Sequence, residues 1–125
     1  MIIGIGTDIA RVARFERATE RHGERFVTRL LGEDEYADFH ARGGAATYLA
    51  KRFAAKEAFV KALGTGLRHG MRWTEIQVVN DGLGRPALRL SGRAEELATA
   101  SGVTGLHVSL SDETEFAMAF VVLEA

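Results

Sequence analysis

Charged residues recur at four-residue spacing in the segment RFAAKEAFVKALGTG, residues 52–66. Arg52 and Lys56 form one such pair, and Glu57 and Lys61 form another. Residues four apart on a helix lie one above the other, so we expect three cations and one carboxylate around a single surface. The opposite side of this helix is expected to carry apolar residues, namely Phe53, Val60 and Leu63.

A surface of this kind suits a polyphosphate ligand. Cations neutralise phosphate charge, and a carboxylate such as Glu57 can hold Mg²⁺, which prefers one or two carboxylates together with phosphate oxygens and water. The alternative is a solvent-exposed helix face on which the two pairs are ordinary surface ion pairs.

Two further segments could contribute to such a site. Asp8 ends a largely apolar first strand, where a buried carboxylate needs a partner. It is either a second metal ligand beside Glu57 or the cap of the following helix. Gly64, Thr65 and Gly66 come directly after the charged helix. They either let a ligand lie against the backbone or simply end the helix.

His107 and Ser109 share one face of an alternating strand, where a hydrogen-bonded structural role is more common than a catalytic one. A serine hydrolase is not indicated, because the sequence holds no nucleophile elbow. Cysteine is absent, which excludes a thiolate nucleophile, a disulfide framework and a cysteine-based zinc site.

The chain has 125 residues, a common size for one domain, and we expect residues 1–125 to form a single domain. No apolar run approaches the length of a membrane span, and the first residues lack the pattern of a signal peptide. We therefore expect a cytoplasmic protein. Residues 11–29 hold six arginines against three glutamates, and a basic segment of this kind favours an acidic partner.

Hydrophobic periodicity predicts one strand, a block of helices and then mostly strands. The expected helices cover residues 11–22, 26–31, 33–41, 45–63 and 92–101, the last of them capped by Ser91. The expected strands cover residues 1–9, 73–80, 86–90, 105–111 and 116–123. The final strand is almost continuously apolar and is expected to be central, with both of its faces covered. This order predicts an α+β fold in which an antiparallel sheet packs against the long helix.

Four segments together resemble the holo-acyl-carrier-protein synthases, the short class of 4'-phosphopantetheinyl transferases. The segments are IGIGTDIARVARFE, RFAAKEAFVKALGTG, NDGLGRP and HVSLSDETEFAMAFVVLE. They occur in the order typical of the family, across nearly the whole chain. The resemblance implies the single-domain fold of that class. It also implies an enzyme that transfers the 4'-phosphopantetheine group of coenzyme A to a serine of an acyl carrier protein, releasing adenosine 3',5'-bisphosphate.

The resemblance also implies roles for single residues. Asp8 and Glu57 would bind Mg²⁺ together with the pyrophosphate of coenzyme A. Lys61 would stabilise or protonate the leaving phosphate. Either Glu57 or a water beside the metal would take the proton of the attacking serine, and the sequence leaves both open. Further residues would lie near coenzyme A, namely Arg52, Lys56, Gly64, Thr65, Gly66, Pro86 and His107.

The partners implied by the resemblance are coenzyme A as substrate and an acyl carrier protein, with neither nucleic acid nor a membrane involved. Arg14, Arg21 and Arg25 would meet the acidic helix of the carrier. Short chains of the family form homotrimers with active sites between subunits. Asp112 stands where many relatives carry histidine, so no role is taken from that position.

Two other interpretations of the same residues stay open. One is a non-catalytic module that binds coenzyme A or a nucleotide. The other is a Mg²⁺-dependent hydrolase of a nucleotide pyrophosphate, with water as the acceptor. Two metal carboxylates are more than binding alone needs, and the basic segment near the first helix favours a protein acceptor over water.

Overall fold

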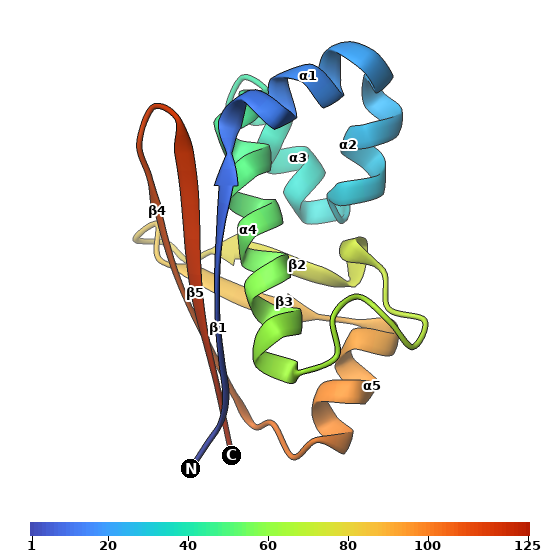
Figure 1. Ribbon diagram of the computed structural model, residues 1–125, viewed down its shortest axis with the longest axis vertical. Helices are drawn as coiled ribbons and strands as arrows, with labels where there is room; N and C mark the ends of the chain where they lie inside the picture. The colour runs from blue at the N-terminus through green and yellow to red at the C-terminus, as the bar shows by residue number, and fades with distance from the viewer.

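A long helix, α4 (Ala46–Leu63), stands at the centre of the computed structural model, which describes residues 1–125 (Figure 1). A three-stranded sheet lies on one side of α4, and helices α1 to α3 gather near one end of it. None of the helices combines the length and the apolar character that crossing a membrane requires. The elements follow in the order β1 (Ile2–Arg11), α1 (Val12–His22), α2 (Glu24–Leu30), α3 (Glu33–Ala41), α4, η1 (Trp73–Glu75), β2 (Ile76–Asn80), β3 (Pro86–Leu90), α5 (Gly92–Ala100), β4 (Gly105–Asp112) and β5 (Phe116–Glu124).

The main sheet is antiparallel, with the strand order β1-β5-β4, and β2 and β3 form a separate antiparallel pair. Ala119 of the central strand pairs with Asp8 on one side and with Leu110 on the other. The two chain ends meet, since the Met1 ammonium donates a hydrogen bond of 2.9 Å to the carbonyl of Ala125. The predicted α+β fold, with an antiparallel sheet on the long helix, is confirmed.

β1 packs so closely against α4 that side chains larger than hydrogen would not fit at two positions of the strand. A β-carbon at Gly4 would lie 1.9 Å from the carbonyl oxygen of Ala62, and one at Gly6 would lie 2.0 Å from that of Ala58. Both strand positions therefore require glycine. Because side chains alternate along a strand, Asp8 belongs to the same inward row and also points toward α4.

β5 is central in the sheet, as predicted, but only one of its faces is covered. The row that faces α4 is buried and consists of Ala117, Ala119, Val121 and Leu123. The outward row is more than one third exposed at Phe116, Met118 and Phe120. The prediction that both faces of β5 are covered is wrong for the single chain. All residues of the run are apolar, but the inward ones are mostly small and buried, whereas the outward ones are larger and partly exposed.

The N-terminus of α5 is capped by a residue outside the helix. Ser91 occupies the cap position, but its side chain makes no hydrogen bond there, so the predicted side-chain cap is wrong. The carboxylate of Glu75 instead accepts hydrogen bonds from the backbone N–H groups of Arg93, at 3.1 Å, and Ala94, at 3.4 Å. Glu75 belongs to η1, a short 3-10 helix that replaces the beginning of the strand predicted for residues 73–80.

We expect Gly6→Ala to lower the free energy of unfolding by about 1–3 kcal/mol, because the added methyl group must push β1 away from α4. Urea unfolding followed by circular dichroism measures the change. Gly82→Ala is the matched control, because a β-carbon at Gly82 meets no atom within 4 Å and its φ is not positive. Equal stability of the two variants would contradict the close packing of β1 on α4.

Candidate active site

Asp8 and Lys61 meet where β1 crosses α4. The Lys61 ammonium lies 3.0 Å from a carboxylate oxygen of Asp8 and donates a second hydrogen bond, of 3.1 Å, to the carbonyl oxygen of Thr7. The Asp8 side chain is mostly buried, whereas about half of the Lys61 side chain is exposed. Arg11 holds the N-cap position of α1. The Asp8 side chain therefore lies against α4 and does not cap α1, the helix that follows it in the sequence.

Glu57 completes a cluster of two carboxylates and two cations. Burial is the largest cause that raises the pKa of Glu57, and the neighbouring charge of Asp8 raises it further. Lys61 and Arg14 lower the pKa of Glu57 by smaller amounts. The pKa of Glu57 therefore lies above its ordinary value. Ionising this carboxyl group is less favourable here than in water, and a further cation nearby would make it more favourable.

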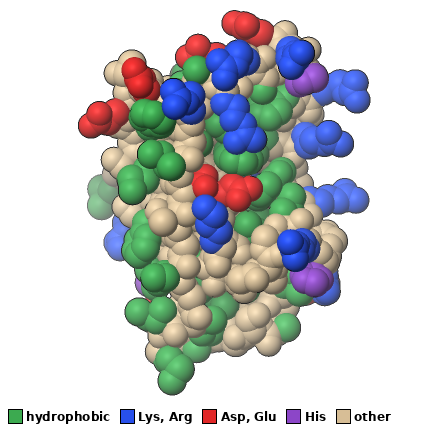
Figure 2. Space-filling view, viewed as in Figure 1, with side chains coloured by type: hydrophobic (Ala, Val, Ile, Leu, Met, Phe, Trp, Pro, Cys, Tyr) green, Lys and Arg blue, Asp and Glu red, His purple; other side chains and the backbone are tan.

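Arg14 and Phe53 form the side of the site nearest to α1. The Arg14 guanidinium lies 4.9 Å from the centre of the Phe53 ring, and this ring packs against the rings of Phe15 and Trp73. Phe53 stands one turn before Glu57 on α4, so the prediction that Phe53 faces the opposite way is wrong. Figure 2 shows an acidic patch beside a basic side chain in the middle of this face, below a band of further basic side chains.

The three cations predicted for one surface do not share a surface. Lys56 points into the protein with an exposure of 0%. Its ammonium donates hydrogen bonds to a carboxylate oxygen of Glu35 at 2.6 Å and to the carbonyl oxygens of Trp73 at 2.9 Å and Ile76 at 2.6 Å. The predicted contact of Lys56 with coenzyme A phosphates does not agree with this position, because all three donors are used inside the protein.

Arg52 lies beneath the surface between α3 and α4, with an exposure of 3%. Its guanidinium sits 4.2 Å from the centre of the Tyr48 ring, and one nitrogen lies 3.7 Å from a carboxylate oxygen of Asp38. The Nε and Nη2 atoms of Arg52 have no hydrogen-bond partner. Buried donors without a partner are rare in folded proteins.

The glycine segment after α4 uses its backbone donors internally. Gly64 ends α4 in the left-handed conformation, with φ at 84°. The N–H groups of Gly64, Thr65 and Gly66 all donate to the carbonyl of Val60, at 3.0, 3.2 and 3.3 Å. These donors are therefore engaged with the helix end. A β-carbon at Gly64 would meet no atom within 4 Å, so a ligand chain has room to lie against this backbone.

Pro86 and His107 lie away from the carboxylate cluster. Pro86 begins β3 and pairs with Asn80 of β2. His107 belongs to the outward row of β4, where its Nε2 lies 2.6 Å from a carboxylate oxygen of Glu124. This hydrogen bond lowers the pKa of Glu124. Because Asp8 points to the inner side of the sheet, a single chain does not bring His107 together with Asp8.

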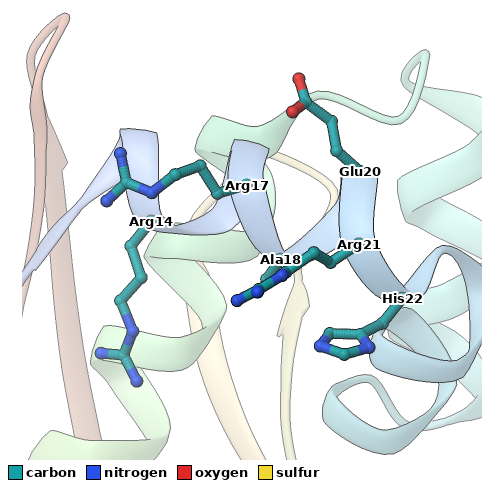
Figure 3. Close-up of a pocket in the computed structure, with 6 residues that line it drawn as sticks. All are labelled: Arg14, Arg17, Ala18, Glu20, Arg21 and His22. Carbon is teal, nitrogen blue, oxygen red and sulfur yellow. The ribbon is translucent and has the colours of Figure 1, made fainter.

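The arginines predicted to dock a carrier lie along two adjoining grooves of α1 and α2. Arg14 and Arg21 line the first groove and Arg25 lines the second. In Figure 3, Arg14 extends from α1 alongside α4, whereas Glu20 points away from it. Since Arg14 is also close enough to lower the pKa of Glu57, the basic surface begins at the carboxylate cluster.

Sequence reasoning missed Glu35 and Trp73. Glu35 is one of three acidic residues in the first turn of α3, where such residues are ordinary, so no signal singled it out. Trp73 begins the segment predicted as a strand, residues 73–80, and no functional role was predicted for it. It packs against the core and lines a groove between α2 and the loop that follows α4, together with Thr28, Arg29, Leu67, Met71, Arg72 and Thr74.

Comparison with known proteins identifies the family. The family model described as the 4'-phosphopantetheinyl transferase superfamily matches residues 4–121. The holo-acyl-carrier-protein synthase of Halorhodospira halophila is 54% identical over 123 residues, which cover 98% of each chain. The chain therefore belongs to the 4'-phosphopantetheinyl transferase superfamily, and the resemblance seen in the four sequence segments is confirmed.

Solved structures agree in fold with this chain. The crystal structure of a holo-acyl-carrier-protein synthase from Neisseria meningitidis matches with a TM-score of 0.92 at 41% identity, covering 100% of both chains. A holo-acyl-carrier-protein synthase from Bacillus anthracis, in complex with CoA (3',5'-ADP), matches with a TM-score of 0.83 at 37% identity. That match covers 100% of this chain and 98% of the other.

We expect Glu57→Gln to stabilise the free protein slightly at neutral pH. A raised pKa means that ionising Glu57 is less favourable in the folded chain than in the unfolded one, so the carboxylate costs stability wherever it is ionised. The gain should disappear as the pH falls through the pKa of Glu57, because the wild-type carboxyl then becomes neutral as well.

Thermal unfolding of both proteins at neutral and at acidic pH measures this effect. Glu16→Gln, at an exposed position of α1, is the matched control and should change the melting temperature little at either pH. A lower melting temperature of Glu57→Gln at neutral pH would show that ionised Glu57 stabilises the fold, contrary to the raised pKa.

Proposed function

We propose that this chain transfers the 4'-phosphopantetheine group of coenzyme A to a serine of an acyl carrier protein and releases adenosine 3',5'-bisphosphate. Membership of the transferase superfamily and the names of its relatives support this activity. The observation that carries it is the cluster of Asp8, Glu57 and Lys61 at the crossing of β1 and α4, where two carboxylates and a cation meet at the surface.

Asp8 and Glu57 fit a Mg²⁺ ion. Burial and, after it, the neighbouring charge of Asp8 raise the pKa of Glu57, and a divalent cation between the two carboxylates would favour their ionised forms. Mg²⁺ commonly takes one or two carboxylates from a protein and its other ligands from phosphate oxygens and water. When bound, the ion would offset charge on the pyrophosphate of coenzyme A.

In the proposed reaction, the serine oxygen of the carrier bonds to the phosphorus that bears the pantetheine arm. The bond from this phosphorus to the oxygen of the leaving bisphosphate breaks. Glu57, or a water beside the metal, is the proposed acceptor of the serine proton. Lys61 is the proposed donor to the leaving phosphate, since its exposed ammonium can exchange Thr7 and Asp8 for a phosphate oxygen.

We assign coenzyme A to the surface around the end of α4. The open side of Gly64, with Thr65 and Gly66 behind it, would take the pantetheine or nucleotide chain. Arg52 remains a proposed phosphate contact, but its Nε and Nη2 atoms are buried, so this contact would require the side chain to move. Pro86 and His107 remain proposed nucleotide contacts. Lys56 is not part of this set, because its donors are already used.

The basic surface of α1 and α2 is the proposed docking site of the carrier protein. Arg14 joins this surface to the carboxylate cluster, and Arg21 and Arg25 extend it away from the cluster. Charges arranged in this way speed and orient the encounter with an acidic partner more than they tighten the final complex. The proposed setting of this encounter is the cytoplasm.

We propose a homotrimer with active sites between subunits, in which the outer face of the sheet makes the subunit contact. Ile5 and Ile9 of β1 are 60% and 62% exposed, and Ile9 pairs with the exposed Met118 of β5. A contiguous apolar face of this kind marks a protein interface. His107 shares that outer face, so it would reach a coenzyme A molecule held by Asp8 only from another subunit. Light scattering tests the assembly, and a monomeric mass would count against it.

We expect a mass gain of one phosphopantetheine group when an apo acyl carrier protein is incubated with coenzyme A, Mg²⁺ and this protein. Intact-mass spectrometry of the carrier measures it. Glu57→Gln should lower the transfer rate about 100-fold or more, as loss of a catalytic base does. Release of the bisphosphate without modification of any carrier would instead favour a pyrophosphate hydrolase.

We expect Arg21→Glu to raise the KM for the carrier about tenfold and to leave the KM for coenzyme A nearly unchanged, because Arg21 lies on the docking surface away from the carboxylate cluster. Steady-state kinetics with each substrate varied in turn measure both constants. Arg21→Lys keeps the charge and is the matched control. Equal increases of the two KM values would argue against carrier docking on α1.

A further inference from the structure

Lys56 is the one lysine of this chain that solvent does not reach. The three lysines, Lys51, Lys56 and Lys61, all lie on α4. Lys51 pairs with Asp112 near the surface, and Lys61 pairs with Asp8 in the candidate active site. The side chain of Lys56 has an exposure of 0%. Burying an ammonium group is costly unless it is paired and hydrogen-bonded, so this position needs a physical explanation.

The Lys56 ammonium is held by one charge and two carbonyl groups. Its nitrogen lies 2.6 Å from a carboxylate oxygen of Glu35, 2.9 Å from the carbonyl oxygen of Trp73 and 2.6 Å from that of Ile76. An ammonium has three donors, and each has one acceptor here. Lys56 therefore ties η1 and the beginning of β2 to the middle of α4.

Glu35 completes the network from the other side. One oxygen of its carboxylate also accepts a hydrogen bond of 3.0 Å from the N–H of Gly32, and the other accepts one of 2.9 Å from the N–H of Val78. The pair thus joins α3, α4, η1 and β2 at one buried point. A buried ion pair often contributes little net stability compared with apolar residues, but it constrains the geometry of the groups that it joins.

The part of the chain that Lys56 holds reaches the candidate active site. Trp73, whose carbonyl Lys56 binds, packs its ring 5.5 Å from that of Phe53. Phe53 stands one turn before Glu57, and the Arg14 guanidinium lies over its ring. The rings of Trp73 and Phe53, which we call the aromatic wall, therefore connect the residue whose carbonyl Lys56 binds with Arg14, beside Glu57.

The aromatic wall faces the side from which the carrier would approach. Trp73 lines the groove between α2 and the loop that follows α4, together with Arg29. Arg29 also lines the second basic groove, in which Arg25 lies. A shift of Trp73 would therefore change the surface between the proposed carrier site and Glu57, and would leave Asp8 and Lys61 in place.

We propose that Lys56 is a positioning residue of the transfer reaction, which holds the carbonyl of Trp73 so that the aromatic wall keeps one position beside Glu57. The proposal rests on the proposed function, because it makes the wall part of the surface that receives the carrier serine. Lys56 acts through Trp73 and touches neither coenzyme A nor the carrier. Its loss affects turnover with the carrier and leaves the binding of coenzyme A nearly unchanged.

Acetic anhydride labelling of the wild-type protein, mapped by mass spectrometry, gives the first test. Because the chain has only three lysines, each can be followed separately. We expect Lys56 to stay unmodified with and without coenzyme A, and Lys61 to react unless coenzyme A is present. Modification of Lys56 in the free protein that coenzyme A suppresses would overturn the proposal, because it would make Lys56 a substrate contact.

The second test uses the double variant Lys56→Met/Glu35→Gln, which removes both charges together and so leaves no unpaired buried charge. Trp73 is the single tryptophan, so its fluorescence reports the aromatic wall directly. We expect the folded variant to show a red-shifted emission with stronger acrylamide quenching. We also expect a kcat lowered about tenfold, with the KM for coenzyme A within about threefold of the wild type.

Lys51→Met is the matched control on the same helix and should leave the emission and both constants unchanged. An unchanged emission and kcat in the folded double variant would overturn the proposal, and so would a raised KM for coenzyme A with an unchanged emission. If the double variant does not fold, the labelling result decides. Neither labelling nor fluorescence needs turnover, so a wild-type protein without transfer activity would refute the proposed function separately.

Discussion

The contact between β1 and α4 determines the rest of the active-site geometry. Gly4 and Gly6 let the strand backbone touch the helix backbone at Ala62 and Ala58. A larger residue at either strand position would move the strand outward by the size of a side chain. The next inward residue is Asp8, so the same contact sets how near its carboxylate lies to Glu57. The raised pKa of Glu57 is thus a consequence of backbone packing, because that packing brings two carboxylates together in a partly buried place.

α4 distributes its charged residues over different surroundings. Lys61 remains exposed beside Asp8, and Glu57 is half-buried. Lys56 and Arg52 turn toward α3 and are buried, the first with every donor used and the second with two donors free. This difference in burial distinguishes a structural role from a ligand-binding role. A buried cation whose donors are all satisfied inside the protein holds structure, whereas one that solvent reaches, such as Lys61, can exchange its partners for a phosphate.

The order of helices and strands could be predicted from the sequence, because each pattern is visible within one segment. Residues 45–63 show the periodicity of a helix, and residues 105–111 show the alternation of a strand. The association of Asp8 with Glu57 followed from the family resemblance and not from the residues themselves. The orientation of α4 could not be predicted, since this helix is covered on several sides and its periodicity does not say which side meets the sheet. Lys56 was misjudged for that reason, because its acceptor Glu35 lies on another helix and the other two acceptors are backbone carbonyls, which no side-chain pattern reveals.

β1 serves two surfaces at once, and this links the active site to the outer face of the sheet. Its inward row carries Gly6 and Asp8, whereas its outward row carries Ile5 and Ile9. A strand that one helix contacts on one side only would be free to bend away from that helix. A second layer on the outward isoleucines would press the strand onto α4 from the other side. Subunit contact on this face would therefore do more than bring His107 to a neighbouring site, because it would also hold Asp8 at its distance from Glu57.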